Sequence, residues 1–180
     1  GGTNLIVDLR AGRRRSGTLM NIAGMRELGG VRREDGHLVI GGGVTIAGLL
    51  DEPLVTRHAS VLRNAASAFG GPLVRNRATV GGNLVDASPA ADLAPPLLAL
   101  DADVELASAE GRRRLPLEEF LVGVRETVLK PQELLVAVRC PVPPPHSAGV
   151  FYKLGPRKAD AISVVSVAVM VEGEGDGRCR

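Results

Sequence analysis

The chain has 180 residues, of which 44% are hydrophobic and 23% charged, and its 22 basic and 20 acidic side chains give a net charge of +2. Only 2% of the residues are aromatic, so the basic surfaces and stacking side chains of a nucleic-acid-binding protein are not expected. Cys140 and Cys179 are far apart, which argues against a zinc site or an iron–sulfur cluster held by this chain alone and fits a cytoplasmic protein. No apolar run approaches the ~20 residues that a transmembrane helix needs.

The sequence opens on two adjacent glycines in "GGTNL" (Gly1–Leu5). Residues without a Cβ let the backbone approach a ligand closely, and successive N–H groups in such a segment can bind anionic oxygens. Thr3 adds a hydroxyl group and is expected to cap a helix over "NLIVDLRAG", whose N-terminus would favour a phosphate. Strands are predicted after it at Thr18–Ile22 and Gly36–Gly42, from runs of β-branched and apolar residues.

Three helices are predicted in the middle of the chain. One begins after Thr45 as its N-cap, and a second spans His58–Phe69, where apolar residues recur on one face. The third begins with Ser88 as N-cap and Pro89 in the first helical position, and the pair Pro95–Pro96 should kink or restart it.

The remainder of the chain reads mainly as strands. They are predicted over Ala102–Ser108, which forms a hairpin with Arg113–Leu115, and over Leu134–Pro141, Gly149–Gly155 and Ser163–Gly173. Short, hairpin-like strands that interleave with helices indicate an α+β fold with mixed sheets rather than one doubly wound sheet.

A second glycine pair lies in "TVGGN" (Thr79–Asn83), again beside a hydroxyl residue and an asparagine. Two segments of this composition suit a diphosphate that needs neutral donors from two sides, although either pair alone would also suit a tight turn. Neither segment has the order G-x-x-x-x-G-K-[ST] or G-x-G-x-x-G, so NTPase and Rossmann folds lose their main support. Asp92 follows the second pair and is either a partner for a helix start or an acceptor for a ribose hydroxyl.

Four stretches in one order carry a resemblance to a known family: "GGTNL", "VRNRATVGGNLVDASPAADLAPPLLALDADVEL", "ETVLKPQELLVAVRCP" and "FYKLGPRKADAISVVSVAV". They resemble the FAD-binding medium subunits of the molybdenum hydroxylases, which include aerobic carbon-monoxide dehydrogenases and xanthine dehydrogenases. The resemblance implies a PCMH-type (vanillyl-alcohol-oxidase-like) FAD-binding domain of two α/β subdomains, truncated at both ends. It assigns residues 1–173 to this domain, without its first strand and helix, and residues 174–180 to the start of a C-terminal domain.

The resemblance also implies which residues contact FAD. The first pyrophosphate segment comprises Gly1, Gly2, Thr3, Asn4 and Leu5, and the second comprises Thr79, Val80, Gly81, Gly82 and Asn83. Asp92 matches the acidic residue that follows, Phe69 an aromatic residue near the flavin, Leu135 an apolar segment beside the isoalloxazine, and Lys153 a lysine at the cofactor. Without the resemblance, Phe69 and Leu135 would be assigned to the core and Lys153 to a strand edge. No catalytic residue and no metal ligand is expected in this chain.

Electron transfer is the function that the resemblance implies. Electrons would leave a molybdenum cofactor on a large partner subunit, pass two [2Fe–2S] clusters on a small iron–sulfur subunit, and reach FAD on this chain, which passes them to NAD or another acceptor. The chain itself would bind and orient the flavin, which carries the redox chemistry. Two other functions stay open: a self-contained PCMH-fold flavin oxidoreductase with its own substrate, and a non-catalytic domain that only docks partner subunits.

Overall fold

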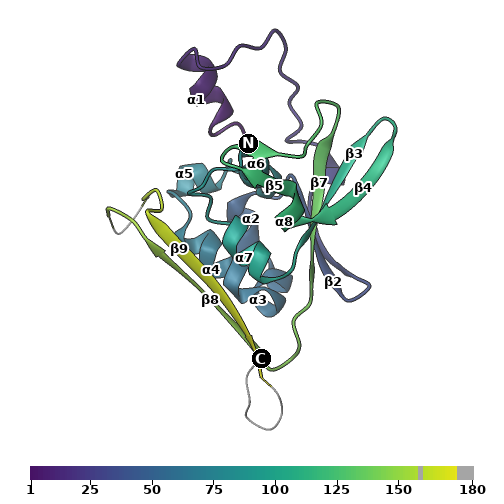
Figure 1. Cartoon of the computed structure of the whole chain (residues 1–180), viewed down its shortest axis with the longest axis vertical. Helices are drawn as coiled ribbons and strands as arrows, with labels where there is room; N and C mark the ends of the chain where they lie inside the picture. The colour runs from purple at the N-terminus through teal and green to yellow at the C-terminus, as the bar shows by residue number, and fades with distance from the viewer. Residues whose placement is uncertain (158–159, 174–180) are drawn as a thin grey trace.

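The computed structural model describes residues 1–157 and 160–173 (Figure 1). Its α-helices are α1 (Leu5–Arg10), α2 (Ile46–Asp51), α3 (Pro53–His58), α4 (Ser60–Ala68), α5 (Pro72–Arg75), α6 (Val80–Asp86), α7 (Ala94–Ala99) and α8 (Leu117–Phe120), and a 3-10 helix, η1, covers Arg26–Leu28. Its strands are β1 (Val31–Glu34), β2 (His37–Gly41), β3 (Asp103–Ser108), β4 (Gly111–Pro116), β5 (Leu121–Gly123), β6 (Glu126–Thr127), β7 (Leu134–Pro141), β8 (Ser147–Leu154) and β9 (Val165–Glu172).

Five strands form one sheet in the order β1-β2-β7-β3-β4, and β5–β6 and β8–β9 form two separate hairpins. β1–β2 and β3–β4 are themselves hairpins, and β7 pairs antiparallel with β2 on one side and β3 on the other. Every strand pairing in the described residues is antiparallel, so the prediction of mixed sheets is wrong. The α+β class is confirmed, because the helices gather against antiparallel sheets instead of connecting parallel strands.

Most of the helices lie between the five-stranded sheet and the β8–β9 hairpin (Figure 1). α4 and α7 pack against the hairpin, while α6 packs against β2 and β7 of the sheet. The core between these layers is built from fully buried side chains of both, which include Leu38, Ile40, Leu62, Leu84, Leu97 and Leu106. α1 and the segment after it extend away from this core, and no residue of α1 is buried.

The strongest local sequence patterns are confirmed. The predicted strands from Gly36 onward correspond to β2, β3, β7, β8 and β9, and the predicted hairpin corresponds to β3–β4. Thr45 is the N-cap of α2, and its hydroxyl oxygen accepts a hydrogen bond from the backbone N–H of Gly48 at 3.0 Å. α4 buries one apolar face, as its periodicity predicts.

Two predicted elements are wrong. Thr18–Ile22 forms no strand, because a strand needs a neighbour for its N–H and C=O groups and the described residues place none beside it. The helix predicted from Ser88 begins later, as α7, and Pro95 and Pro96 lie in its first turn, where their missing N–H groups are not needed. Ser88 lies in the preceding turn, where its Oγ accepts from the backbone N–H of Ala90 at 3.3 Å.

Within residues 1–157 and 160–173, every helix is too short or too polar to cross a membrane. The same residues contain no cluster of three His, Cys, Asp or Glu side chains suited to a metal ion. Residues 174–180, which the sequence assigns to the start of a further domain and which include Cys179, lie outside the described part.

An ion pair between Arg113 and Glu133 ties β4 to the loop before β7. Arg113 Nε and Nη2 donate to the two carboxylate oxygens of Glu133 at 2.6 and 2.8 Å. These bonds, with a further one from the backbone N–H of Lys130, lower the pKa of Glu133 to about 2. A carboxyl group whose pKa is lower in the folded state stabilises the fold above its unfolded-state pKa, and this contribution is lost as the pH falls toward the folded-state value.

We therefore expect Glu133→Gln to lower the free energy of unfolding at neutral pH, with the difference from the wild type shrinking as the solution is acidified toward the pKa of Glu133. Urea denaturation over a series of pH values measures this. The matched control is Glu110→Gln, because Glu110 is an exposed residue in the β3–β4 turn. A difference that stays constant over the pH series would contradict the assignment.

Cys140 is expected to be chemically inert in the folded protein. Its side chain lies in the core and is 1% exposed, and burial raises the pKa of the thiol to about 12. Because the thiolate is the reactive form, a Cys179→Ser variant should resist an aromatic disulfide reagent at neutral pH until it is unfolded. Rapid modification of the native variant would show that β7 does not bury this thiol.

Candidate functional site

The two glycine segments lie on the walls of one cleft. A cavity of about 380 Å³ is lined by all five residues of Gly1–Leu5 and by Thr79, Gly82 and Asn83 of the second segment. Phe69, which follows α4, lines the same cavity. The two segments therefore converge, as the sequence predicts, while their binding of a ligand stays a prediction.

The second segment is the start of a helix rather than a loop. Thr79 is the N-cap of α6, and its Oγ accepts from the backbone N–H of Gly82 at 3.1 Å. The N–H groups of Val80 and Gly81 donate to the carbonyls of Val44 and Gly42, each at 2.9 Å. The prediction that successive amides of this segment point at the ligand is therefore wrong, because the fold itself uses them.

Gly81 is a glycine for a packing reason. It is buried, and a Cβ at this position would lie 2.8 Å from the carbonyl oxygen of Gly42. Gly42 is itself confined, since a Cβ there would overlap the carbonyl of Leu135 on β7. α6 thus approaches the sheet backbone to backbone, and the second segment presents the cleft with the side chains of Thr79 and Asn83 and the exposed backbone of Gly82.

Thr79 and Asn83 each keep a donor for the cleft. The Thr79 oxygen accepts from Gly82, so its hydroxyl proton is not used in that bond. Asn83 Oδ1 accepts from the backbone N–H of Leu93 at 3.4 Å, which leaves both N–H groups of the side-chain amide to donate elsewhere. Both donors are neutral.

The first segment is anchored at both of its ends. A Cβ on Gly1 would overlap the carbonyl of Arg77, so a glycine is required where the first segment passes the residues that precede Thr79. Gly2 has φ = +77°, a conformation that other residues rarely adopt. Asn4 Nδ2 donates to Asp86 Oδ2 at 2.8 Å, which joins the start of α1 to the end of α6.

Thr3 lines the cleft. The prediction that it caps α1 is wrong. The N-cap position belongs to Asn4, and its side chain makes no capping hydrogen bond because it is turned to Asp86. Within the described part of the chain, the hydrogen bonds of the backbone leave the N–H groups of Thr3, Asn4 and Leu5 without an acceptor. The N–H group of Gly2 has no acceptor there either, so the backbone amides of Gly2–Leu5 are available as donors at the cleft.

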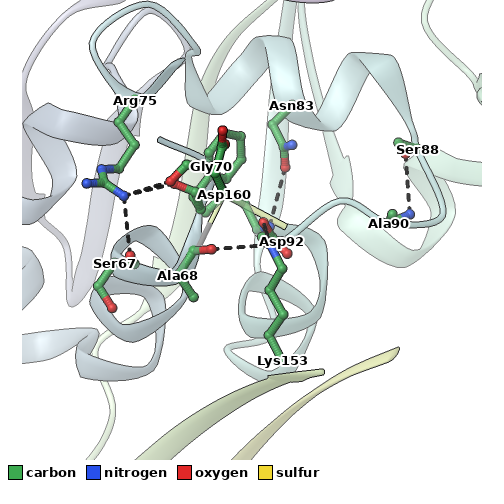
Figure 2. A network of polar contacts seen from close by, with 12 residues as sticks. Ser67, Ala68, Gly70, Arg75, Asn83, Ser88, Ala90, Asp92, Lys153 and Asp160 are labelled. Carbon is green, nitrogen blue, oxygen red and sulfur yellow. Dashed lines mark hydrogen bonds and ion pairs between the residues drawn. The ribbon is translucent and has the colours of Figure 1, made fainter. Parts of the chain in front are cut away.

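Asp92 and Lys153, both predicted from the resemblance, form an ion pair outside the lining of the cleft. Figure 2 shows Lys153 reaching from β8 to Asp92 and to the carbonyl of Ala68, at 2.6 and 3.2 Å. The side chains of the ion pair are only 7% and 8% exposed. Burial raises the pKa of Asp92, against the opposing effect of the Lys153 ammonium group. Asp92 Oδ1 is buried and has no hydrogen-bond partner in the described residues.

The ion pair is connected to the cleft through neighbouring backbone. Ala68 precedes Phe69, and Leu93, which donates to Asn83, follows Asp92. Arg75 Nη1 fixes the end of α4 by donating to the carbonyls of Phe69 and Gly70 at 3.1 and 2.9 Å. Figure 2 shows the guanidinium group of Arg75 beside Gly70. The backbone of Phe69, a residue that lines the cavity, is thus held in position.

Not every predicted residue lies at the cleft surface. Val80, Gly81, Asp92, Leu135 and Lys153 do not line the cavity. Leu135 is 3% exposed and sits opposite Leu106 in the sheet, where its side chain belongs to the core. Its backbone carbonyl, next to Gly42, is the part that faces the α6 junction.

Several residues that line the cleft are not predicted from the sequence. They are Asp8, Arg14, Val74, Ala78, Val85 and Asp86. Asp8 and Asp86 lie four residues after Asn4 and Gly82 on short helices, so a helical spacing of i to i+4 from the glycine segments would have found them. Arg14 lies in an irregular segment and carries no such signal.

Comparisons with known proteins identify the family of the chain. Residues 1–143 match the sequence family described as "FAD binding domain in molybdopterin dehydrogenase". The nicotinate dehydrogenase FAD-subunit of Eubacterium barkeri is 34% identical over 182 residues, covering 99% of this chain and 62% of that protein. The xanthine dehydrogenase FAD-binding subunit of Escherichia coli O157:H7 is 35% identical over 170 residues, covering 93% of this chain and 58% of that protein.

The fold has a close match among solved structures. Carbon monoxide dehydrogenase from Hydrogenophaga pseudoflava, in a form that lacks the Mo-pyranopterin moiety, superposes with a TM-score of 0.92 at 29% identity, over 97% of this chain and 60% of that one. This chain thus spans about three fifths of the length of the proteins that it matches. The resemblance seen in the sequence is confirmed, and the chain belongs to the family of FAD-binding domains of molybdopterin dehydrogenases.

Proposed function

We propose that this chain binds FAD with its diphosphate between the two glycine segments, and that it is the electron-transferring flavin subunit of a molybdenum-containing hydroxylase complex. The observation that carries the proposal is the convergence of Gly1–Leu5 and Thr79–Asn83 on one cleft. Family membership supports FAD as the cofactor, and the neutral donors on both walls suit a diphosphate.

Each wall contributes donors of a different kind. The amides of Thr3, Asn4 and Leu5 serve one side of the diphosphate, and the hydroxyl of Thr79 and the amide nitrogen of Asn83 serve the other. Gly82 lets the ligand approach the backbone, and Gly81 lets α6 pack closely against the backbone at Gly42.

Asp92 and Lys153 act together in this proposal. Asp92 Oδ1, which has no partner among the described residues, would accept a ribose hydroxyl once the bound cofactor makes this buried oxygen accessible. Lys153 keeps Asp92 ionised and oriented through its bond to Oδ2. Phe69 and the backbone at Leu135 flank the flavin.

FAD, when bound, supplies the redox chemistry, and the chain's own residues bind it, orient it and hold its charge. No acid or base from this chain is required for electron transfer. The proposal includes an iron–sulfur subunit and a molybdenum-binding subunit as partners, NAD or another compound as the final acceptor, and a cytoplasmic location. The names of the relatives, as FAD subunits of nicotinate and xanthine dehydrogenases, support this assignment.

One experiment separates this function from the two alternatives. The full-length protein is purified with and without its partner subunits, its FAD content is measured, and the flavin absorbance is followed as substrate of the complex is added. We expect bound FAD in both samples and loss of flavin absorbance only when the partners are present. Flavin that is reduced by a substrate without the partners would indicate a self-contained oxidoreductase, and a flavin-free protein would indicate a docking domain.

A further inference from the structure

The charges around the cleft are unfavourable for a diphosphate at first sight. Among the described residues that line the cavity, the ionisable side chains are Asp8, Arg14 and Asp86. Two carboxylates and one guanidinium give the walls a formal charge of −1, whereas a bound diphosphate adds further negative charge. The cleft can accept an anion only if both carboxylates are neutralised by other groups.

Both carboxylates are neutralised in the structure. Arg125 Nη1 donates to Asp86 Oδ1 at 3.0 Å, and Asn4 occupies the other oxygen at 2.8 Å. Arg13 approaches Asp8 Oδ1 with Nε at 2.9 Å and Nη2 at 2.8 Å. Each acidic residue of the cleft therefore has a guanidinium group at hydrogen-bonding distance.

Among the described residues that line the cavity, Arg14 is the cation that makes no hydrogen bond to a carboxylate. Its Nε lies 3.8 Å from Asp8 Oδ2, beyond hydrogen-bond distance, and its side chain is 59% exposed. The group formed by Asp8, Arg13 and Arg14 has a formal charge of +1. Of its two cations, Arg14 lines the cavity and Arg13 does not. Lys153 does not compete for this role, because it is paired with Asp92 at 2.6 Å.

We propose that Arg14 offsets the charge of the FAD diphosphate and thereby makes the site select flavins that carry phosphate. This inference rests on the proposed function. The planar guanidinium fork binds phosphate oxygens by two parallel hydrogen bonds, which neutral amides and hydroxyls complement but do not replace. The backbone N–H of Arg14 donates to the carbonyl of Asp8 at 3.3 Å, which holds Arg14 at the cleft.

The test is FAD titration of the full-length protein after its flavin has been removed, at about 0.1 M and about 1 M NaCl, between which the Debye length falls from about 10 Å to about 3 Å. Arg14→Ala should weaken FAD binding roughly tenfold at the lower salt and much less at the higher salt, since a solvent-exposed charge is screened. Arg14→Lys should recover part of the loss. Riboflavin, which lacks phosphate, should bind wild type and Arg14→Ala equally.

Arg15→Ala is the matched control, because Arg15 is an exposed neighbour that does not line the cavity. Wild-type affinity in Arg14→Ala at low salt, or an equal loss in Arg15→Ala, would overturn the role of Arg14. So would a loss that is the same at both salt concentrations. Failure of the wild-type protein itself to bind FAD would instead overturn the proposed function.

Discussion

Replacing Lys153 by Met is expected to lower the free energy of unfolding by about 3–5 kcal/mol, the usual cost of removing one partner of a buried ion pair. The substitution leaves Asp92 with no cation in an environment where its side chain is 7% exposed. It also removes the bond from Nζ to the carbonyl of Ala68 at the end of α4. Both lost interactions connect β8 of the β8–β9 hairpin with the helices that pack against it.

Urea denaturation of three variants separates this effect from ordinary surface substitution. Lys130→Met, at an exposed position, should change stability little. The double variant Lys153→Met/Asp92→Asn should recover most of the lost stability, because no unpaired charge is then buried. Acidification should also recover stability in the single variant, since burial raises the pKa of Asp92 and protonation discharges it. A single variant as stable as Lys130→Met would refute the buried pair.

The second large effect is expected for Asn83→Asp. This change keeps the side-chain shape but replaces the amide donor with a carboxylate oxygen, so the diphosphate loses a hydrogen bond and meets a negative charge. Hydrogen bonds to charged groups contribute about 1.5–3 kcal/mol, and with the added repulsion we expect FAD affinity to fall on the order of 100-fold. Asn83 Oδ1 can still accept from Leu93, so the fold should be preserved.

Fluorescence titration with FAD measures this loss. Asn64→Asp on the exposed side of α4 introduces the same charge away from the cleft and should bind FAD like the wild type. Thermal unfolding of both variants without FAD checks that any difference arises in binding. Equal affinity of the two variants would show that Asn83 does not contact the diphosphate.

Much of the fold is predictable because its signals are local. β2, β3 and β7 follow from short β-branched runs, and α2 follows from a threonine cap before an apolar segment. Thr18–Ile22 has the same kind of pattern and forms no strand, since strand formation depends on a neighbour that the local sequence does not reveal. The start of α7 was misplaced because Ser88 and Pro95 both carry helix-start signals, and the structure uses the second.

The site was predictable in composition but not in its bonding. The glycines, hydroxyls and amides of the two segments are visible in the sequence, and they do lie together. The bonds from Val80 and Gly81 to the loop between β2 and α2 are long-range, so the sequence does not show that these amides are already used. The same holds for the partners Asn4–Asp86 and Asp92–Lys153, which lie 82 and 61 residues apart.

A crystal structure of the complex with FAD bound tests the central claim most directly. We expect the diphosphate oxygens at hydrogen-bond distance from the amides of Thr3 and Asn4 on one wall, and from Thr79 Oγ and Asn83 Nδ2 on the other. A diphosphate held elsewhere, with nothing bound between the two glycine segments, would contradict the account.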